Sequence, residues 1–344
     1  MSETYLERLA RRSTETNTVL CVGLDPDPAS LPDGFGRDLA GVERFARLVL
    51  ESAIPFAAAV KPNLAFFEAF GSAGLAALER LRATIPADVP VIMDAKRGDI
   101  GTTAARQATA LFDALGADAI TVNPYLGGEA VAPLLERLDR FAYLLCRTSN
   151  PGAAELQSLV VAAAPAGEQV AGGEAAPAPA EPLYARVARR AVEWGPGGTV
   201  GLVVGATAPA ELAEIRAVAP GLAFLVPGVG AQGGEIEPVL RDGRAVADPA
   251  GGRPGGGLLV NVSRGIAAAA IDASDPAADG HGRARMGCPP ARATLTAERR
   301  HAREPTFERV PPPPGALDHA SPERSRVDRH PHHRVADPRA RQAT

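Results

Sequence analysis

The sequence predicts an α/β fold of the (β/α)8 TIM-barrel class. Eight short apolar segments of strand length lie within residues 1–272, and nearly all of them precede a segment with helical periodicity. Strict alternation of strands and helices over about 250 residues is typical of this barrel. A doubly wound sheet is the alternative. It usually has fewer strands, and no Gly-x-Gly-x-x-Gly fingerprint follows the first strand here.

The first half of the chain shows the two patterns that define these elements. Its strands are continuous apolar runs, as expected of strands buried on both faces. Its helices repeat apolar residues every three or four positions, and Gly116 closes the last of them. In order we expect an opening helix, a strand at 18–24, a helix at 42–49, a strand at 57–61, a helix at 66–82, a strand at 89–93 and a helix at 108–115.

The second half continues the alternation and then loses it. In order we expect strands at 118–122, 141–146 and 199–204, a helix at 211–218, strands at 222–226 and 257–262, and a closing helix of about two turns at 264–271. Residues 160–182 are rich in Ala, Pro and Gly and predict a low-complexity surface excursion from the barrel. Residues 247–257 predict a loop.

The last segment, residues 273–344, predicts a disordered tail. It is rich in Arg, Pro and His, contains all six histidines, and lacks helical periodicity. We hypothesise that it is read from a shifted frame. The barrel before it contains no histidine, which disfavours metal and Ser-His-Asp chemistry there.

Composition predicts an ordinary soluble, cytoplasmic protein, large enough for a full core. The formal charge is −4, and no apolar run reaches the roughly 20 residues that span a membrane. The N-terminus lacks the basic and apolar regions of a signal peptide. Cys21 and Cys146 lie in predicted strands and read as buried apolar residues in a reducing compartment. We expect neither a nucleic acid nor a membrane as a partner.

One polar stretch, residues 94–101, stands where the third strand passes into its helix. Lys61 and Lys96 are the only lysines among 36 basic residues, and both follow strands. Arginine is a poor proton donor, so two retained lysines suggest proton transfer or a compact ammonium. Together with Asp94 and Asp99 they form a charged set at the barrel mouth, able to serve a reaction that forms or removes charge. The alternative is a purely structural ion-pair network.

A second set of residues follows the last two strands. Gly228, Gly230 and Gln232 come after the seventh strand, and Ser263-Arg264-Gly265 after the eighth. Backbone amides at a helix N-terminus with one arginine bind anions, and barrels often hold phosphate at this place. The sequence therefore predicts a phosphate site, with ordinary turn glycines as the alternative.

These motifs together resemble the orotidine 5′-phosphate decarboxylases, in particular the bacterial subgroup that includes mycobacterial enzymes. Lys61 followed by Asp94-x-Lys96-x-x-Asp99 is similar to their Lys-Asp-Lys-Asp array. The resemblance covers about residues 5–270. It rests on the segments 22–26, 94–100, 147–152, 226–230 and 262–265.

The resemblance implies decarboxylation of orotidine 5′-phosphate to UMP, the last step of de novo pyrimidine biosynthesis, with no metal or organic cofactor. It implies that Lys96 gives a proton to C6 after carbon dioxide leaves, and that Asp94 lies against the substrate carboxylate. Lys61 and Asp25 would hold the ribose hydroxyls.

It also implies a homodimer with shared active sites, in which Asp99 and Thr103 reach into the partner's site. The remaining substrate contacts would come from Ser149 to the pyrimidine and from Gln232 and Arg264, beside Gly230, to the phosphate.

Two other functions stay open. A magnesium-dependent sugar-phosphate decarboxylase or aldolase of the same suprafamily shares the Asp-x-Lys-x-x-Asp core, but would need a further carboxylate ligand. A non-catalytic nucleotide-phosphate binder is the second, because binding could survive where turnover did not. Fold analogy does not separate these possibilities.

Overall fold

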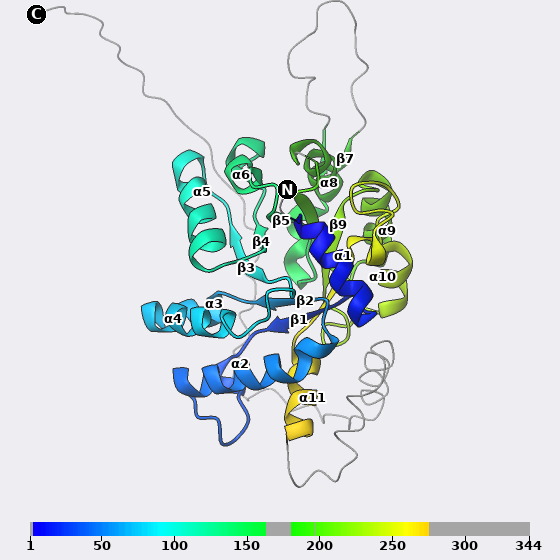
Figure 1. The fold of residues 1–344 in the computed structure, drawn as a ribbon. Helices are drawn as coiled ribbons and strands as arrows, with labels where there is room; N and C mark the ends of the chain where they lie inside the picture. The colour runs from blue at the N-terminus through cyan, green and yellow to red at the C-terminus, as the bar shows by residue number, and fades with distance from the viewer. Residues whose placement is uncertain (1–2, 163–179, 196, 275–344) are drawn as a thin grey trace, which may run out of the picture. The chain divides into compact units, whose positions relative to one another are not determined.

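The chain forms a barrel of parallel strands with helices around it (Figure 1). The structure is a computed structural model that describes residues 3–162, 180–195 and 197–274. Most of the predicted excursion and nearly all of the predicted tail lie outside these ranges. The hypothesis that the tail is read from a shifted frame concerns residues that the structure does not describe.

Eight strands form one sheet in the order β2-β1-β10-β9-β8-β5-β4-β3, and every pairing is parallel. Isolated bridges from Val60 to Val91 and from Asn63 to Asp94 join β2 to β3, the two ends of that order. The sheet therefore closes, which confirms the predicted barrel. The strands are β1 (Leu20–Leu24), β2 (Ala59–Pro62), β3 (Ile92–Arg97), β4 (Ala119–Val122), β5 (Phe141–Arg147), β8 (Val200–Val204), β9 (Ala223–Pro227) and β10 (Leu259–Val262).

Helices follow most strands and cover the outside of the barrel (Figure 1). The sequence predicted several of them but did not specify α6, α7, α8 or α10. They are α2 (Leu39–Ala53), α3 (Ala65–Glu68), α4 (Gly71–Arg82), α5 (Gly101–Ala108), α6 (Gly128–Leu135), α7 (Ala154–Gln157), α8 (Leu183–Trp194), α9 (Pro209–Val218), α10 (Ile236–Asp242) and α11 (Arg264–Ser274). None of the helices within the described ranges is both long and apolar enough to cross a membrane.

The opening helix α1 (Tyr5–Thr16) covers the N-terminal end of the barrel. Thr4 and Glu7 form a capping box that starts it. Its Tyr5 ring stacks on Phe141, the first residue of β5, at 4.7 Å between ring centroids. Because this end is filled by aromatic and aliphatic side chains, the opposite, C-terminal end is where polar groups can gather.

Apolar side chains pack in two clusters, one inside the barrel and one between its strands and helices. Strand residues alternate between the two, since successive side chains point to opposite faces. In β1, for example, Cys21 belongs to the inner cluster and Val22 to the outer one. The strands are thus buried on both faces, which explains their continuous apolar runs.

Three segments differ from the prediction. The single helix expected at 66–82 is two helices, because Gly71 has φ +62° and turns the chain between α3 and α4. The helix expected at 108–115 begins earlier, as α5, and ends in a π-helical turn, Thr109–Ala114. The loop at 247–257 ends in a 3₁₀ turn, Pro254–Gly257.

The closing helix is longer than predicted. The sequence suggested about two turns, whereas α11 has 11 residues and packs against α2. At the base of the excursion, β6 (Val160–Val161) and β7 (Glu181–Pro182) pair antiparallel.

Candidate active site

Polar side chains gather at the C-terminal ends of β2, β3 and β4. In each strand an inner apolar residue is followed two positions later by a polar residue, which therefore points to the same side. These polar residues are Lys61, Asp94 and Thr121. The barrel thus brings together two predicted site residues and one that the sequence analysis did not single out.

Asp94 lies between the two lysines of the chain. Its Oδ2 accepts a hydrogen bond from Lys61 Nζ at 2.6 Å, and its Oδ1 accepts one from Lys96 Nζ at 2.5 Å. Lys61 is buried, whereas the Lys96 side chain is 51% exposed toward the mouth. One ammonium therefore holds the carboxylate from inside, and the other can reach a molecule in the mouth.

Asp94 and Lys61 each shift the pKa of the other toward its charged form. Burial favours a higher pKa for Asp94, but Lys61 and Lys96 outweigh it and hold the pKa of this carboxyl far below its ordinary value. Burial likewise favours a lower pKa for Lys61, but the charges of Asp94 and Asp25 raise it. Asp94 and Lys61 therefore both stay ionised near neutral pH. The buried Cys21 thiol has its pKa raised to about 12, mainly by burial, and is inert.

The backbone at Lys96 is unusual. Lys96 has φ +48°, and the pairing of β3 with β4 shifts register between Met93 and Arg97. Thr121 Oγ1 accepts hydrogen bonds from the amides of Ala95 and Lys96, at 3.0 Å each, and donates one to Asp94 Oδ1 at 2.8 Å. In the sequence, the only feature that could have singled out Thr121 is its inward position in the strand predicted at 118–122.

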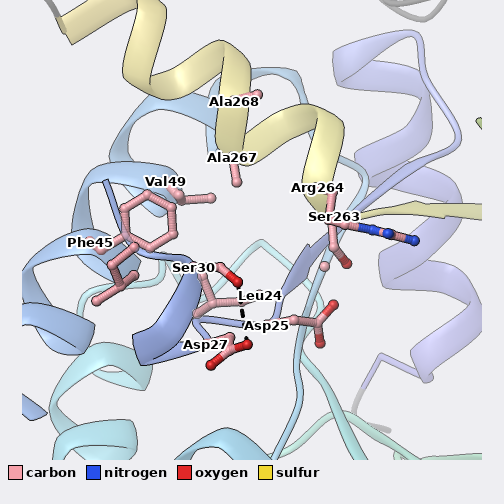
Figure 2. Close-up of a pocket in the computed structure, with 12 residues that line it drawn as sticks. Leu24, Asp25, Asp27, Ser30, Phe45, Val49, Ser263, Arg264, Ala267 and Ala268 are labelled. Carbon is pink, nitrogen blue, oxygen red and sulfur yellow. Dashed lines mark hydrogen bonds between the residues drawn. The ribbon is translucent and has the colours of Figure 1, made fainter. Parts of the chain in front are cut away.

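Asp25 stands at the end of β1, next to this group. Its Oδ1 is buried and has no hydrogen-bond partner among the described residues. With Ser263 and Arg264 it lines a pocket between the ends of β1 and β10, shown in Figure 2. The other wall is apolar and comes from α2 and α11, with Phe45 and Ala267 among its residues. An unpartnered carboxylate oxygen is suited to accept a hydrogen bond from a ligand hydroxyl.

A glycine-rich turn follows β9 and meets the start of α11. Gly230 has φ +72°, and its amide donates to the carbonyl of Gly234 at 3.0 Å. The Arg264 guanidinium reaches this turn and lies 3.5 Å from the carbonyl of Ala231. Gln232 is exposed on the same turn. The predicted phosphate residues are therefore together at one side of the mouth.

Ser149 joins this side from the loop after β5. A Cβ placed on Gly228 would lie 2.9 Å from Ser149 Cβ and 3.2 Å from Gln232 Oε1. The side chains of Ser149 and Gln232 therefore lie near the same position beside Gly228. A Cβ on Gly205 would lie 2.8 Å from the backbone of Ser149. The absence of side chains at Gly205 and Gly228 therefore lets the Ser149 loop lie against β8 and β9.

The structure does not bring Asp99 and Thr103 into the charged group of their own chain. Within the described residues, Asp99 accepts one hydrogen bond, from the amide of Ile100 at 2.8 Å. Thr103 is exposed on α5. Both lie beside the mouth, where a second molecule could meet them.

The arrangement can bind an anionic ligand at two separated points. Arg264 and the turn after β9 form one positive end, and Lys96, with its free face, forms the other. Asp94 lies between the two lysines, and Asp25 lines the pocket beside Arg264. Such fixed charges can stabilise a reaction that moves charge. Within the described ranges, no group of three or more His, Cys, Asp and Glu side chains is placed to hold a metal ion.

Known proteins match this chain along most of its length. A family model described as Orotidine 5′-phosphate decarboxylase / HUMPS family matches residues 18–278. The orotidine 5′-phosphate decarboxylase of Thermomicrobium roseum is 46% identical over 263 residues, which are 76% of this chain and 86% of that protein. The one from Herpetosiphon aurantiacus is 43% identical over 263 residues, 76% of this chain and 88% of its own.

Solved structures agree in fold. The OMP decarboxylase of Leishmania donovani has a TM-score of 0.64 and 37% identity, and the match covers 87% of this chain and 98% of that one. A putative orotidine-monophosphate-decarboxylase from Toxoplasma gondii has a TM-score of 0.67 and 34% identity, covering 86% and 99%. By family model, sequence and structure, the chain belongs to the orotidine 5′-phosphate decarboxylase / HUMPS family.

Proposed function

We propose that this protein decarboxylates orotidine 5′-phosphate to UMP without a cofactor. The observation that carries the proposal is Asp94 held between Lys61 and Lys96 at the mouth of a barrel of this family. Relatives at 43% and 46% identity bear the name orotidine 5′-phosphate decarboxylase. This name favours the decarboxylase over a magnesium-dependent lyase and over a non-catalytic binder.

In the proposed reaction Lys96 is the proton donor. The bond between C6 and the carboxylate carbon breaks, carbon dioxide leaves, and the electron pair stays on C6. An ammonium beside C6 stabilises this carbanion and then transfers its proton to it. Asp94 lies against the departing carboxylate, and its negative charge disfavours the bound carboxylate more than the product. Lys96 is well suited to this because its side chain is half exposed toward the mouth.

The other predicted residues bind the substrate. Lys61 and Asp25 hold the ribose hydroxyls, which suits the unpartnered oxygen of Asp25. Ser149 contacts the pyrimidine. The phosphate lies against Gln232 and Arg264, beside Gly230, where the geometry offers a guanidinium and an exposed turn. Binding energy from this distant phosphate helps to organise the reacting end.

The active unit in this proposal is a cytoplasmic homodimer that shares its active sites. Asp99 and Thr103 would enter the partner's site. Ile100, the neighbour of Asp99 in the sequence, is 55% exposed, and Tyr125, in the loop after β4, the strand next to β3, is 83% exposed. An exposed apolar area beside a polar site suits a protein interface.

The test is an assay of orotidine 5′-phosphate absorbance with EDTA present, with UMP identified by chromatography. We expect full turnover in EDTA and none from Lys96→Ala. Activity that EDTA abolishes and magnesium restores would support the magnesium-dependent alternative. Tight UMP binding with no turnover would support the binder.

A further inference from the structure

Thr121, on the inner face of β4, has a hydroxyl group that uses all of its hydrogen-bonding positions. Thr121 is 2% exposed. Two of its three partners are backbone amides, of Ala95 and Lys96, which can only donate. The hydroxyl proton must therefore point to the third partner, Asp94 Oδ1, at 2.8 Å. The orientation of this hydroxyl follows from its neighbours.

The two amides need this acceptor because β3 bulges away from β4. Met93 pairs with Ile120, and Arg97 pairs with Val122. Three residues of β3, 94 to 96, thus oppose the single residue 121 of β4. In a bulge the extra residues lose their ladder partners. The Thr121 hydroxyl replaces the missing carbonyl for both amides.

The bulge also contains the strained residue of the site. Lys96 has φ +48°, a left-handed conformation that non-glycine residues adopt rarely. Such a conformation persists only where the surroundings hold it. The bond from the Lys96 amide to Thr121 is a direct restraint on that backbone. The same hydroxyl orients Asp94, which binds the Lys96 ammonium.

We propose that Thr121 is a positioning residue that holds Lys96 in its left-handed conformation and fixes the rotation of the Asp94 carboxylate. The inference rests on the proposed function for its kinetic consequence. Thr121 acts through Lys96 and Asp94. Its hydroxyl has no bonding position left for a ligand.

The kinetic test compares Thr121→Val with Thr121→Ser. Valine keeps the shape and burial of threonine but removes the hydroxyl, while serine keeps the hydroxyl. Misplacement of a reacting group by about 1 Å can cost on the order of 100-fold in rate. We expect kcat of Thr121→Val to fall about 10- to 100-fold with KM changed less than about threefold, since the phosphate residues are untouched. Thr121→Ser should return kcat to within a few-fold of the unmodified protein.

Thr199 offers a matched control. It is 1% exposed, directly precedes β8, and its Oγ1 is buried without a partner among the described residues. Thr199→Val should leave kcat and KM unchanged. If Thr121→Val keeps normal kcat, or if Thr121→Ser is as slow as Thr121→Val, the positioning role is wrong.

A crystal structure of Thr121→Val separates this inference from the proposed function. We expect Lys96 to leave the left-handed region or the Asp94 carboxylate to rotate, whether or not the protein is a decarboxylase. An unchanged Lys96 backbone and Asp94 carboxylate would overturn the inference even in an active enzyme. An inactive unmodified protein would overturn the proposed function alone.

Discussion

At the scale of single residues, the site depends on one carboxylate held by three donors. Asp94 receives hydrogen bonds from Lys61, Lys96 and Thr121. Two of these donors carry charge, so the carboxylate stays ionised although it is largely buried.

Lys96→Arg should fold and bind UMP normally but lose turnover by at least about 100-fold. The guanidinium keeps its proton and is too large to replace the ammonium beside Asp94. Single-turnover kinetics measure the loss, and UMP titration with thermal melting provides the control. Activity within tenfold of the unmodified protein would remove Lys96 as the proton donor.

Arg264→Ala should raise KM for orotidine 5′-phosphate about 10- to 100-fold, as expected for a lost charged hydrogen bond of roughly 1.5–3 kcal/mol. Turnover of orotidine, which lacks the phosphate, should be unchanged. Arg253→Ala is the matched control, because Arg253 lies near Glu7 of α1, at the other end of the barrel. Equal losses with both substrates would show that Arg264 does not bind phosphate.

Asp94→Asn should destabilise the fold near neutral pH, because it leaves the buried Lys61 without its main counter-ion. Breaking a buried pair costs roughly 3–5 kcal/mol, and we expect the lower end because Asp25 remains nearby. The surface pair of Asp113 and Arg137 provides the control, Asp113→Asn, with a change of about 0–1 kcal/mol.

The pH dependence of that difference has a definite sign. The folded-state pKa of Asp94 is depressed, so its stabilisation is present above the unfolded-state pKa, about 3.9, and is lost as pH falls through the folded value. Urea unfolding should therefore show a constant gap between Asp94→Asn and the unmodified protein at pH 5–8. The gap should shrink below about pH 4. A gap that grows in acid would contradict the assignment.

At the scale of elements, two local interruptions of regular structure position the site. The bulge in β3 presents Lys96, and glycines at the ends of β8 and β9 let the Ser149 loop approach. Both lie at the C-terminal ends of strands, where irregular backbone does not interrupt the packed interior. The regular parts of the same strands carry the core.

Gly205→Ala tests the second interruption. The added Cβ would lie 2.8 Å from backbone atoms of Ser149, so the loop must move. We expect a loss of about 1–3 kcal/mol in stability and weaker substrate binding. Gly152→Ala, in the same loop, meets only side-chain atoms, of Glu155 at 3.4 Å and of Asn150 at 3.8 Å, and should change stability by less than about 0.5 kcal/mol. Chemical denaturation and KM measure both, and equal effects would refute the close-approach argument.

At the scale of the whole molecule, one acidic residue predicted for the site, Asp99, does not join the charged group of its own chain. Within the described residues, Asp99 accepts a hydrogen bond only from the amide of Ile100, whose own side chain is exposed. The dimer proposed above is one in which Asp99 of each subunit enters the site of the other.

Mixing Asp99→Ala protein with Lys96→Ala protein tests this dimer. Each variant alone should be inactive. In a mixed dimer one site carries both substitutions and the other carries neither. Random exchange makes about half of the dimers mixed, so up to about a quarter of normal activity should return. If native mass spectrometry shows mixed dimers and no activity returns, Asp99 acts within its own chain.

The barrel and most of its site were predictable because their signals are local. An apolar run predicts a buried strand wherever it occurs, and strand alternation places Lys61 and Asp94 on the inside without knowledge of their neighbours. Helix ends were less predictable. The break at Gly71 and the added turn of α11 depend on packing against other elements.

What only the tertiary structure decided is which residue faces which across the barrel. Thr121 reads in the sequence as one strand threonine among several. It becomes part of the site because three residues of β3 oppose it, and this register is set by the pairing of two strands. Ser149 likewise comes close to the turn that carries Gln232 only because Gly228, at the end of another strand, has no side chain in the space between them. Composition and periodicity are local properties of the sequence, and they determine the helices and strands. The site is completed by hydrogen bonds between strands that are distant in the sequence, and these form only in the folded barrel.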